Sequence, residues 1–310
     1  MKALVLKDFD TAPEVAEVDL PEPGAGEVRV RIKAASINGF DVAVAGGRLK
    51  GMMTHRFPVV VGKDYAGVID ALGQDVTEFV VGDRVFGVVS KEDLGDGSFG
   101  EYVTVPVATG IARIPEGIGY TEAAALGLAG TAAADAFDAA AIGAGQRVLV
   151  AGATGGVGQQ VVQLAAKAGA EVVATATSDE EVAKVRELGA ASTVDYRADV
   201  AAQVRQLHPS GVDAVLHFAG DPAALASIVR EGGVLVSTLV MDPAQLQVEG
   251  VRVVPIFAQS TNATLERIAR DHAEGHTAVT VQRVYTLDEA PDALGHFAAG
   301  TLGKLVLAIN

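Results

Sequence analysis

The chain has 310 residues, enough for two domains, and 49% of them are apolar, so it can bury a substantial core. Its formal net charge of −15 argues against a surface that neutralises nucleic-acid phosphates. The absence of cysteine excludes disulfides, thiolate metal sites and a cysteine nucleophile.

The first residues carry Asp8 and Asp10 and lack a sustained apolar run, which is not typical of a signal peptide. The most apolar stretch, 123–145, is rich in Ala and Gly and contains Asp135 and Asp138, so it indicates a packed soluble helix. We therefore expect a cytoplasmic protein whose partner is a small molecule, and neither a nucleic acid nor a membrane.

Residues 1–120 favour β-structure. Short apolar runs separated by glycines predict strands at Ala3–Leu6, Glu27–Ala34, Val59–Val61, Ala66–Ala71 and Val85–Val88. Many short strands with glycine turns are typical of a barrel-like or sandwich-like domain.

From about residue 120 helices alternate with apolar strands. The predicted helices are Tyr120–Ala141, Val157–Ala168, Asp179–Leu188, Val200–Leu207 and Pro222–Arg230. The predicted strands are Arg147–Ala151, Glu171–Ala176, Ser192–Val194, Ala214–Phe218, Val234–Ser237 and Val251–Pro255. This order implies right-handed βαβ units and a parallel sheet, so the fold class is α/β.

The last part of the chain, from about residue 257, predicts helices at Thr264–Glu274 and Glu289–Ala299 and a strand at Lys304–Ile309. Asp288 is placed to cap the second of these helices and Gly300 to end it.

The most specific motif is the glycine-rich loop Gly152-Ala-Thr-Gly155-Gly156-Val157-Gly158, which follows a strand and opens a helix. A tight turn, close approach to a pyrophosphate and close helix–sheet packing all favour residues without a Cβ. The helix N-terminus adds N–H groups and partial positive charge. We therefore expect a dinucleotide site that includes Thr154 of this loop.

The cofactor preference depends on the end of the next strand, where a carboxylate would bind the ribose 2′-OH of NAD. No carboxylate follows at Ala176, and the hydroxyls of Thr177 and Ser178 could accept a 2′-phosphate. The competing interpretation is that Ser178 caps its own helix in the capping box Ser178-Asp-Glu-Glu181. Tyr196 and Arg197 are further candidates, and we predict NADPH, with NADH as the alternative.

The order and spacing of several motifs resemble the zinc-free quinone oxidoreductase branch of the medium-chain dehydrogenase/reductase superfamily over essentially the whole chain. The motifs are Asn38-Gly-Phe-Asp41, Gly46-Gly47, Phe57-Pro58, Gly62-Lys-Asp64-Tyr-Ala-Gly67, Gly82-Asp-Arg-Val-Phe-Gly87, Gly97-Ser-Phe-Gly-Glu-Tyr102, the glycine loop, Glu187-Leu-Gly-Ala190, Val194-Asp-Tyr-Arg197 and Gly303-Lys304-Leu-Val-Leu.

The resemblance implies a GroES-like β-rich catalytic domain from residues 1–120 and 257–310. A Rossmann domain with a doubly wound parallel sheet would span residues 121–256, and the cofactor would lie in the cleft. It also implies a homodimer joined through sheet edges, with Val234–Ser237 and the segment after it as the candidate edge.

The same resemblance implies that no metal is bound. The positions of the catalytic zinc ligands in zinc-dependent relatives correspond to Asn38, Lys63 and the region of Leu128 here, and the cysteines of the structural zinc lobe are absent. An amide, an ammonium and an apolar side chain do not hold Zn²⁺.

Cofactor contacts follow from the resemblance for Gly155, Gly156, Val157, Ser178, Tyr196 and Lys304. Phe218, Ala219, Leu239 and Phe257 are implied to lie near the nicotinamide and its ribose. Two departures are visible. Many NADPH-using relatives carry a lysine at the position of Glu181, and the tyrosines of several quinone reductases are missing from the loop around Arg48–Met53.

Hydride addition to a quinone or conjugated carbonyl creates an oxyanion or enolate that must be stabilised or protonated. Lys63 is the leading catalytic candidate because its ammonium would partly replace a Lewis acid; a lysine that forms a salt bridge to Asp64 or Asp41, or that is simply exposed, is the alternative. Asn38 could bind a cofactor or substrate oxygen, or satisfy a local turn. Asp41 is the third candidate, with a structural role as its alternative.

We therefore expect a zinc-independent NADPH:quinone oxidoreductase. One alternative is a reductase of enones or enoyl thioesters, for which Arg48, Lys50 and Arg56 would be the basic residues that attract a charged carrier. The other is an NADPH-binding redox sensor without turnover.

Overall fold

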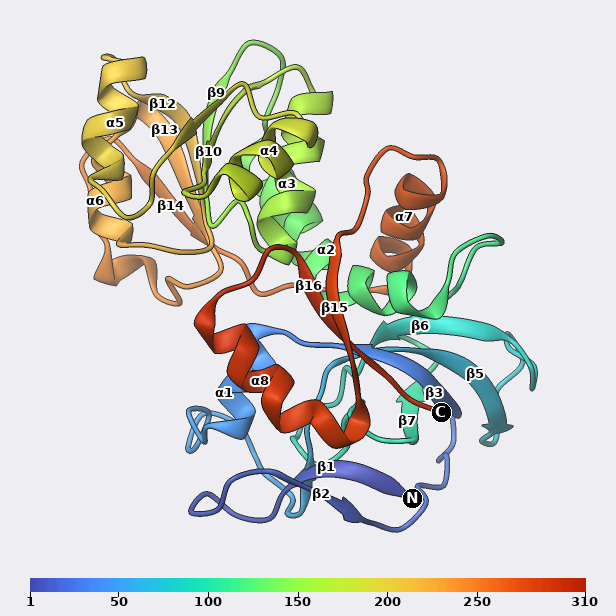
Figure 1. The fold of residues 1–310 in the computed structure, drawn as a ribbon. Coiled ribbons are helices and arrows are strands. Elements are labelled where there is room, and N and C mark those ends of the chain that lie inside the picture. Colours follow the sequence, from blue (N-terminus) through green and yellow to red (C-terminus); the bar gives the residue numbers. More distant parts are fainter. The chain divides into compact units, whose positions relative to one another are not determined.

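The computed structural model describes all residues from Met1 to Asn310, and the chain divides into two compact units (Figure 1). Unit 1 contains residues 1–131, 260–273 and 279–310, and unit 2 contains residues 132–259 and 274–278. The boundaries expected at residues 120 and 257 differ from these. One reason is that helix α2, Tyr120–Ala140, continues without a break from unit 1 into unit 2.

Unit 1 is a β-rich domain built from both ends of the chain. Its strands are β1 (Lys2–Leu6), β2 (Glu14–Glu17), β3 (Glu27–Ser36), β4 (Val59–Val60), β5 (Asp64–Leu72), β6 (Arg84–Val88), β7 (Tyr102–Pro106), β8 (Ile111–Arg113), β15 (Val281–Thr286) and β16 (Lys304–Ala308). Its helices are α1 (Gly39–Ala45), α7 (Asn262–Ala273) and α8 (Ala290–Ala299), with a 3₁₀ turn η2 (Leu287–Glu289).

Two sheets form this unit. A three-stranded sheet has the order β2-β1-β4, and a seven-stranded sheet has the order β15-β16-β3-β5-β6-β8 with β7 paired to β3. Strand β3 lies between β16 and β5 and is antiparallel to both. Its alternating buried residues Val28, Val30 and Ile32 join one hydrophobic core. Each fully buried Val or Ile stabilises the unit by about 1.5–3 kcal/mol.

Unit 2 is a doubly wound parallel domain. Its strands are β9 (Arg147–Ala151), β10 (Glu171–Thr175), β11 (Ser192–Val194), β12 (Val212–His217), β13 (Val229–Ser237) and β14 (Arg252–Pro255). Its helices are α3 (Gly156–Lys167), α4 (Asp179–Glu187), α5 (Val200–Leu207) and α6 (Pro222–Ala226), with a 3₁₀ turn η1 (Pro243–Gln245). The strand order is β11-β10-β9-β12-β13-β14, and every pair is parallel.

Both faces of this sheet are covered, which explains why its strands are continuous apolar runs. Along β9, Val148 and Val150 pack in a core with residues of α2, α3 and α4, while Leu149 and Ala151 pack in another with residues of α5 and α6. A doubly wound parallel sheet in unit 2 and a β-rich unit 1 confirm the predicted α/β fold class.

Two element predictions were wrong in detail. The helix predicted at Pro222–Arg230 ends at Ala226, because Val229 already pairs with Val212 in the parallel ladder. Asp288 does not cap α8. It lies in η2 and accepts hydrogen bonds from the ammonium of Lys2, and α8 begins one residue later, after Glu289.

The predicted edge strand Val234–Ser237 is also corrected by the sheet order. It belongs to β13, which is paired on both sides, so the edge on that side is β14. Five strands and α-helices were not predicted, namely β2, α1, β7, β8 and β15, and the 3₁₀ turns η1 and η2 were not predicted either.

None of the helices combines the length and the apolar composition that crossing a membrane requires. The cytoplasmic location and the homodimer stay predictions.

Candidate active site and cofactor-binding residues

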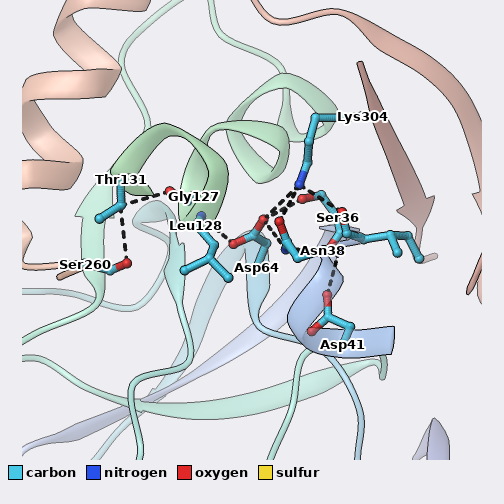
Figure 2. Close-up of polar contacts among 10 residues, drawn as sticks. Ser36, Asn38, Asp41, Asp64, Gly127, Leu128, Thr131, Ser260 and Lys304 are labelled. Carbon is cyan, nitrogen blue, oxygen red and sulfur yellow. Dashed lines mark hydrogen bonds and ion pairs between the residues drawn. The ribbon is translucent and has the colours of Figure 1, made fainter. Parts of the chain in front are cut away.

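A buried group of charged and polar side chains lies in unit 1, where β3, α1, β5 and β16 meet (Figure 2). We name it the Asp64 cluster; it consists of Ser36, Asn38, Asp41, Asp64 and Lys304. The antiparallel ladder brings it together, because Ser36 at the end of β3 is registered with Asp64 of β5 and with Val306 of β16.

Asp64 is the centre of this cluster and is completely buried. Its Oδ2 accepts hydrogen bonds from Ser36 Oγ at 2.5 Å and Asn38 Nδ2 at 2.8 Å, and it lies 3.5 Å from Lys304 Nζ. Its Oδ1 accepts from the backbone N–H of Leu128 at 2.7 Å. A buried carboxylate requires such a set of donors, because an unpartnered one would be very costly.

Helix α2 approaches Asp64 through Gly127. A Cβ on Gly127 would stand 2.5 Å from Asp64 Oδ1, so only glycine leaves room for the bond between Asp64 and the next backbone N–H. The contact is visible in Figure 2. The helix is thereby fixed to the strand that carries the cluster.

Lys304 is the cation of the cluster, with 4% of its surface exposed. Its ammonium donates to Asn38 Oδ1 at 2.7 Å and to the Ile37 carbonyl at 2.9 Å, besides its ion pair with Asp64. Burial lowers the pKa of this lysine, and the charges of Asp64 and Asp41 act in the opposite direction. Three acceptors therefore surround an ammonium that has three N–H groups.

Asn38 and Asp41 were predicted as catalytic residues, and the structure places both within this network. The amide of Asn38 donates to Ser36 O and Asp64 Oδ2 and accepts from Lys304, so both of its polar atoms are in use. Asp41 Oδ2 accepts from the backbone N–H of Asn38 at 2.8 Å, where α1 begins. Asp41 Oδ1 is buried and has no hydrogen-bond partner.

Asp41 consequently has an unusual acidity. Burial, and secondly the charge of Asp64, raise the pKa of Asp41 from 3.8 to about 7. The N–H of Asn38 and the charges of Lys304 and Lys63 lower it, but they do not compensate. Asp41 is thus a carboxyl that changes protonation near neutral pH.

Lys63, the leading catalytic candidate, adjoins this cluster on the residue before Asp64. Its ammonium donates to the carbonyl of Val89 at 2.7 Å and lies 5.0 Å from the centre of the Phe40 ring. No ion pair with Asp41 or Asp64 forms. Burial lowers the pKa of Lys63, opposed by those two charges. Its ammonium keeps N–H groups that have no protein acceptor.

The predicted cofactor residues, apart from Lys304 of unit 1, share one position in unit 2. They follow the carboxyl ends of strands in the same parallel sheet. They are Thr154, Gly155, Gly156 and Val157 after β9; Thr177 and Ser178 after β10; Tyr196 and Arg197 after β11; Phe218 and Ala219 after β12; Leu239 after β13; and Phe257 after β14. This edge is where ligands bind in open α/β sheets.

The glycine loop fits a pyrophosphate. The helix it opens, α3, has Gly155 as its N-cap, no capping side chain and no acidic residue in its first turn. By contrast, Ser178, Asp199 and Asp221 cap α4, α5 and α6 with their side chains. The N–H groups at the start of α3 therefore remain available to an anion.

Close packing explains the last glycine of the loop. A Cβ on Gly158 would stand 2.1 Å from the carbonyl oxygen of Gly152, so the loop closes only without one. Thr175 Oγ1, at the end of β10, accepts the N–H of Gly152 at 2.9 Å and holds the turn.

Thr177, Ser178 and Tyr196, three of the residues expected to bind a 2′-phosphate, already donate hydrogen bonds to carboxylates. Glu181 Oε2 accepts the backbone N–H groups of Thr177 at 2.7 Å and Ser178 at 3.1 Å, and Glu181 Oε1 accepts the hydroxyl of Tyr196 at 3.1 Å. The hydroxyl of Thr177 donates to Asp195 at 2.6 Å. The capping role of Ser178 is confirmed, since its Oγ accepts the Glu181 N–H.

Sequence reasoning missed two members of the Asp64 cluster. Ser36 was not considered, and Lys304 was predicted only as a cofactor residue. A lysine at the start of the apolar run Lys304–Ala308 was a signal of unusual burial, but its partners depend on the pairing of β16 with β3.

Comparison with known proteins agrees with this description. Residues 24–116 match the family model of the alcohol dehydrogenase GroES-like domain, and residues 156–264 match that of the zinc-binding dehydrogenases. A chloroplast envelope quinone oxidoreductase homolog from Arabidopsis thaliana is 29% identical over 95% of this chain and 93% of its own. A mycocerosic acid synthase-like polyketide synthase from Mycolicibacterium smegmatis is 39% identical over 69% of this chain, and the match spans only 10% of that relative.

Solved structures share the whole fold. The quinone oxidoreductase from Coxiella burnetii has a TM-score of 0.91 at 25% identity, covering 100% of this chain and 99% of its own. A mycobacterial protein, Rv1454c, complexed with NADPH has a TM-score of 0.87 at 25% identity, covering 99% of each chain.

The β-rich unit and the parallel-sheet unit correspond to these two family models. The chain belongs to the medium-chain dehydrogenase/reductase superfamily, in its quinone oxidoreductase branch.

Proposed function

We propose that this protein is a zinc-independent NADPH:quinone oxidoreductase. The observation that carries the proposal is the set of groups at the positions that correspond to the catalytic zinc ligands of zinc-dependent relatives. Where zinc-dependent relatives hold their metal, this chain has an amide with both polar atoms in use, a lysine, and a backbone N–H that binds Asp64. None of these groups is a zinc ligand.

The bound cofactor would supply the hydride. The glycine loop and the start of α3 would bind its pyrophosphate, and Phe218, Ala219, Leu239 and Phe257 would hold its reactive end. Leu239 and Phe257 are more than half exposed, which suits side chains that cover a ligand. To donate a hydrogen bond to the cofactor, the Lys304 ammonium would have to release one of its three present acceptors, which are the Ile37 carbonyl, Asn38 Oδ1 and Asp64 Oδ2.

Among the protein's groups, Lys63 is the one suited to stabilise the developing oxyanion. Its ammonium keeps free N–H groups, whereas that of Lys304 is surrounded by acceptors. Asn38 and Asp41 position the network around Lys304 and Asp64 and do not touch the substrate. A quinone suits this arrangement, because its hydroquinone anion is stable enough to need little acid assistance.

The choice of NADPH rests on Ser178, Tyr196 and Arg197, and on the absence of a carboxylate directly after β10. NADH is the second candidate, favoured by one observation. The carboxylate of Glu181 already holds Tyr196 and the Ser178 N–H, and it would repel a 2′-phosphate there.

Reduction of an enone or enoyl thioester is the second candidate reaction, favoured by the polyketide synthase relatives. The basic residues expected to attract a carrier are partly engaged. Arg56 forms ion pairs with Asp93 and Asp96, and the ammonium of Lys50 lies over the Phe9 ring.

The test is oxidation of NADPH, and separately of NADH, followed at 340 nm with a small benzoquinone and with EDTA present. Rapid oxidation that EDTA does not change supports the proposal. Oxidation only with an enoyl thioester would replace it with the second candidate. Cofactor binding without oxidation by any acceptor would instead support the redox-sensor alternative.

A further inference from the structure

His217 is a fully buried histidine that the proposed reaction does not use. It is the last residue of β12 and is registered with Ser237, the last residue of β13, which is also fully buried. The two side chains therefore stand side by side where the sheet ends and the predicted cofactor loops begin.

The hydrogen bonds fix the protonation of the histidine ring. Ser237 Oγ accepts the backbone N–H groups of Leu239 and Val240, both at 2.9 Å, and lies 2.8 Å from His217 Nδ1. A hydroxyl has two lone pairs and one proton, so with both lone pairs in use it donates that proton to Nδ1. Nδ1 is then unprotonated, and Nε2 carries the proton that it donates to the Gly220 carbonyl at 3.1 Å.

The surroundings keep this ring neutral. Burial lowers the pKa of His217, while the Gly220 carbonyl and the charge of the nearby Asp221 act in the opposite direction. A ring that accepts at one nitrogen and donates at the other has no place for a second proton unless the Ser237 hydroxyl turns away and loses the N–H groups of Leu239 and Val240.

This ring is bonded to two turns of unit 2, one of which contacts the glycine loop. It holds Gly220, which ends the turn after β12, and through Ser237 it holds the turn after β13. In the turn after β12, Ala219 lies against the glycine loop, since a Cβ on Gly152 would stand 3.1 Å from the Ala219 Cβ. The Phe218 N–H donates to the carbonyl of Ala151 at 2.9 Å.

We propose that His217 is a positioning residue that holds the turns at residues 218–220 and 239–240 in the geometry that orients the nicotinamide end of the cofactor. The inference rests on the proposed function, which assigns Phe218, Ala219 and Leu239 to that end. His217 exchanges no proton with substrate or cofactor, and it acts only through the two turns.

Three substitutions separate its two hydrogen bonds. His217→Phe keeps an aromatic ring and loses both bonds. His217→Gln reaches the Nε2 position and can still donate to Gly220, whereas His217→Asn reaches the Nδ1 position and can still accept from Ser237. Misplacing a reacting group by about 1 Å costs roughly 100-fold in rate. We expect the hydride-transfer rate of His217→Phe to fall about 10- to 100-fold, with smaller losses for the other two.

The affinity for the cofactor should change little, because the glycine loop and Thr177 and Ser178 keep their own contacts. The measurements are the single-turnover rate with a benzoquinone, the Kd for NADPH and NADH, and the fluorescence anisotropy of the bound reduced nicotinamide. In His217→Phe the anisotropy should fall while Kd stays within about threefold. An unchanged rate and anisotropy would overturn the proposal.

A second test uses the wild-type protein, so it does not depend on whether a substituted protein folds. With ¹⁵N-labelled histidine, the His217 resonances should show an unprotonated Nδ1 and a protonated Nε2, unchanged from about pH 5.5 to pH 8.5. A proton on Nδ1, or titration within this range, would contradict the inference.

Failure of the proposed function would look different. If no acceptor oxidises the bound cofactor, the reductase assignment is wrong, yet the anisotropy of His217→Phe still tests the positioning role. If the wild type binds neither NADPH nor NADH, both proposals are wrong.

Discussion

Replacing Asp41 with asparagine should stabilise unit 1 at neutral and alkaline pH, although it removes a fully buried group from a polar cluster. The pKa of Asp41 is raised from 3.8 to about 7 in the native protein. Below pH 3.8 the carboxyl is protonated in both states. Between pH 3.8 and about pH 7, the Asp41 carboxyl is protonated in the folded state and ionised in the unfolded state. The free energy of unfolding therefore falls as the pH rises through this range.

The size of this loss follows from the shift. One pKa unit corresponds to about 1.4 kcal/mol, so a shift of roughly three units costs at most about 4 kcal/mol once the pH exceeds 7. Between pH 5 and pH 8 the share lost is about 2–3 kcal/mol. Asp41→Asn carries no charge at any pH and keeps an oxygen for the Asn38 N–H, so its advantage over wild type should grow by that amount.

Urea unfolding at a series of pH values, followed by tyrosine emission, measures this difference. The signal reports mainly on unit 1, because four of the five tyrosines lie there and the chain has no tryptophan. Curves of unfolding free energy against pH that run parallel for Asp41→Asn and wild type would refute the reasoning.

Asp64→Asn is the matched control, because the same chemical change should have the opposite sign. Asp64 accepts hydrogen bonds from Ser36, Asn38 and Leu128 and forms an ion pair with Lys304. In Asp64→Asn, the new NH₂ group would be directed at a hydrogen-bond donor, and the Lys304 ammonium would lose the carboxylate charge. We expect a loss of about 3–5 kcal/mol, the usual cost of breaking a buried ion pair.

Three further predictions follow from the described contacts. Lys63→Met should lower kcat/KM for the quinone about 100-fold with the Kd for NADPH unchanged, and Lys63→Arg should recover part of it; an unchanged rate would remove Lys63 from the mechanism. Glu181→Gln should raise the ratio of kcat/KM for NADPH to that for NADH roughly tenfold, because it removes a charge beside the expected 2′-phosphate; a constant ratio would place the phosphate elsewhere. Gly127→Ala should destabilise unit 1 by about 1–3 kcal/mol because its Cβ meets Asp64, whereas Gly295→Ala in α8, with open space around it, should cost nothing; equal urea midpoints for the two would contradict the close contact.

Much of unit 2 could be predicted from local patterns. The apolar run Arg147–Ala151 indicates a buried strand, and the glycine-rich segment after it indicates a tight turn into a helix. Both signals are local, because the residues that determine each structure are adjacent in the sequence. The boundary between α6 and β13 could not be predicted from the local sequence. Val229 belongs to the strand because it pairs with Val212 of β12, and this pairing forms only in the folded sheet.

The candidate site divides in the same way. Asn38, Asp41 and Lys63 could be selected because they lie in short motifs, and the capping role of Ser178 because its partner Glu181 is three residues away. The position of Lys304 beside Asn38 depends on two strand registers and could not be predicted from spacing. The engagement of Tyr196 by Glu181 likewise requires the ends of β10 and β11 to be placed in space.

The split layout of unit 1 also affects how the chain acquires its structure during synthesis. Lys304 follows Asn38 by 266 residues, and β16 is an inner strand of the seven-stranded sheet. Unit 2 is made from one nearly continuous stretch and can condense first, while Asp64 still lacks its ammonium. A nascent chain therefore holds an unfinished sheet with an open edge beside β3, the kind of surface that pairs with other chains, until the ribosome has delivered β16.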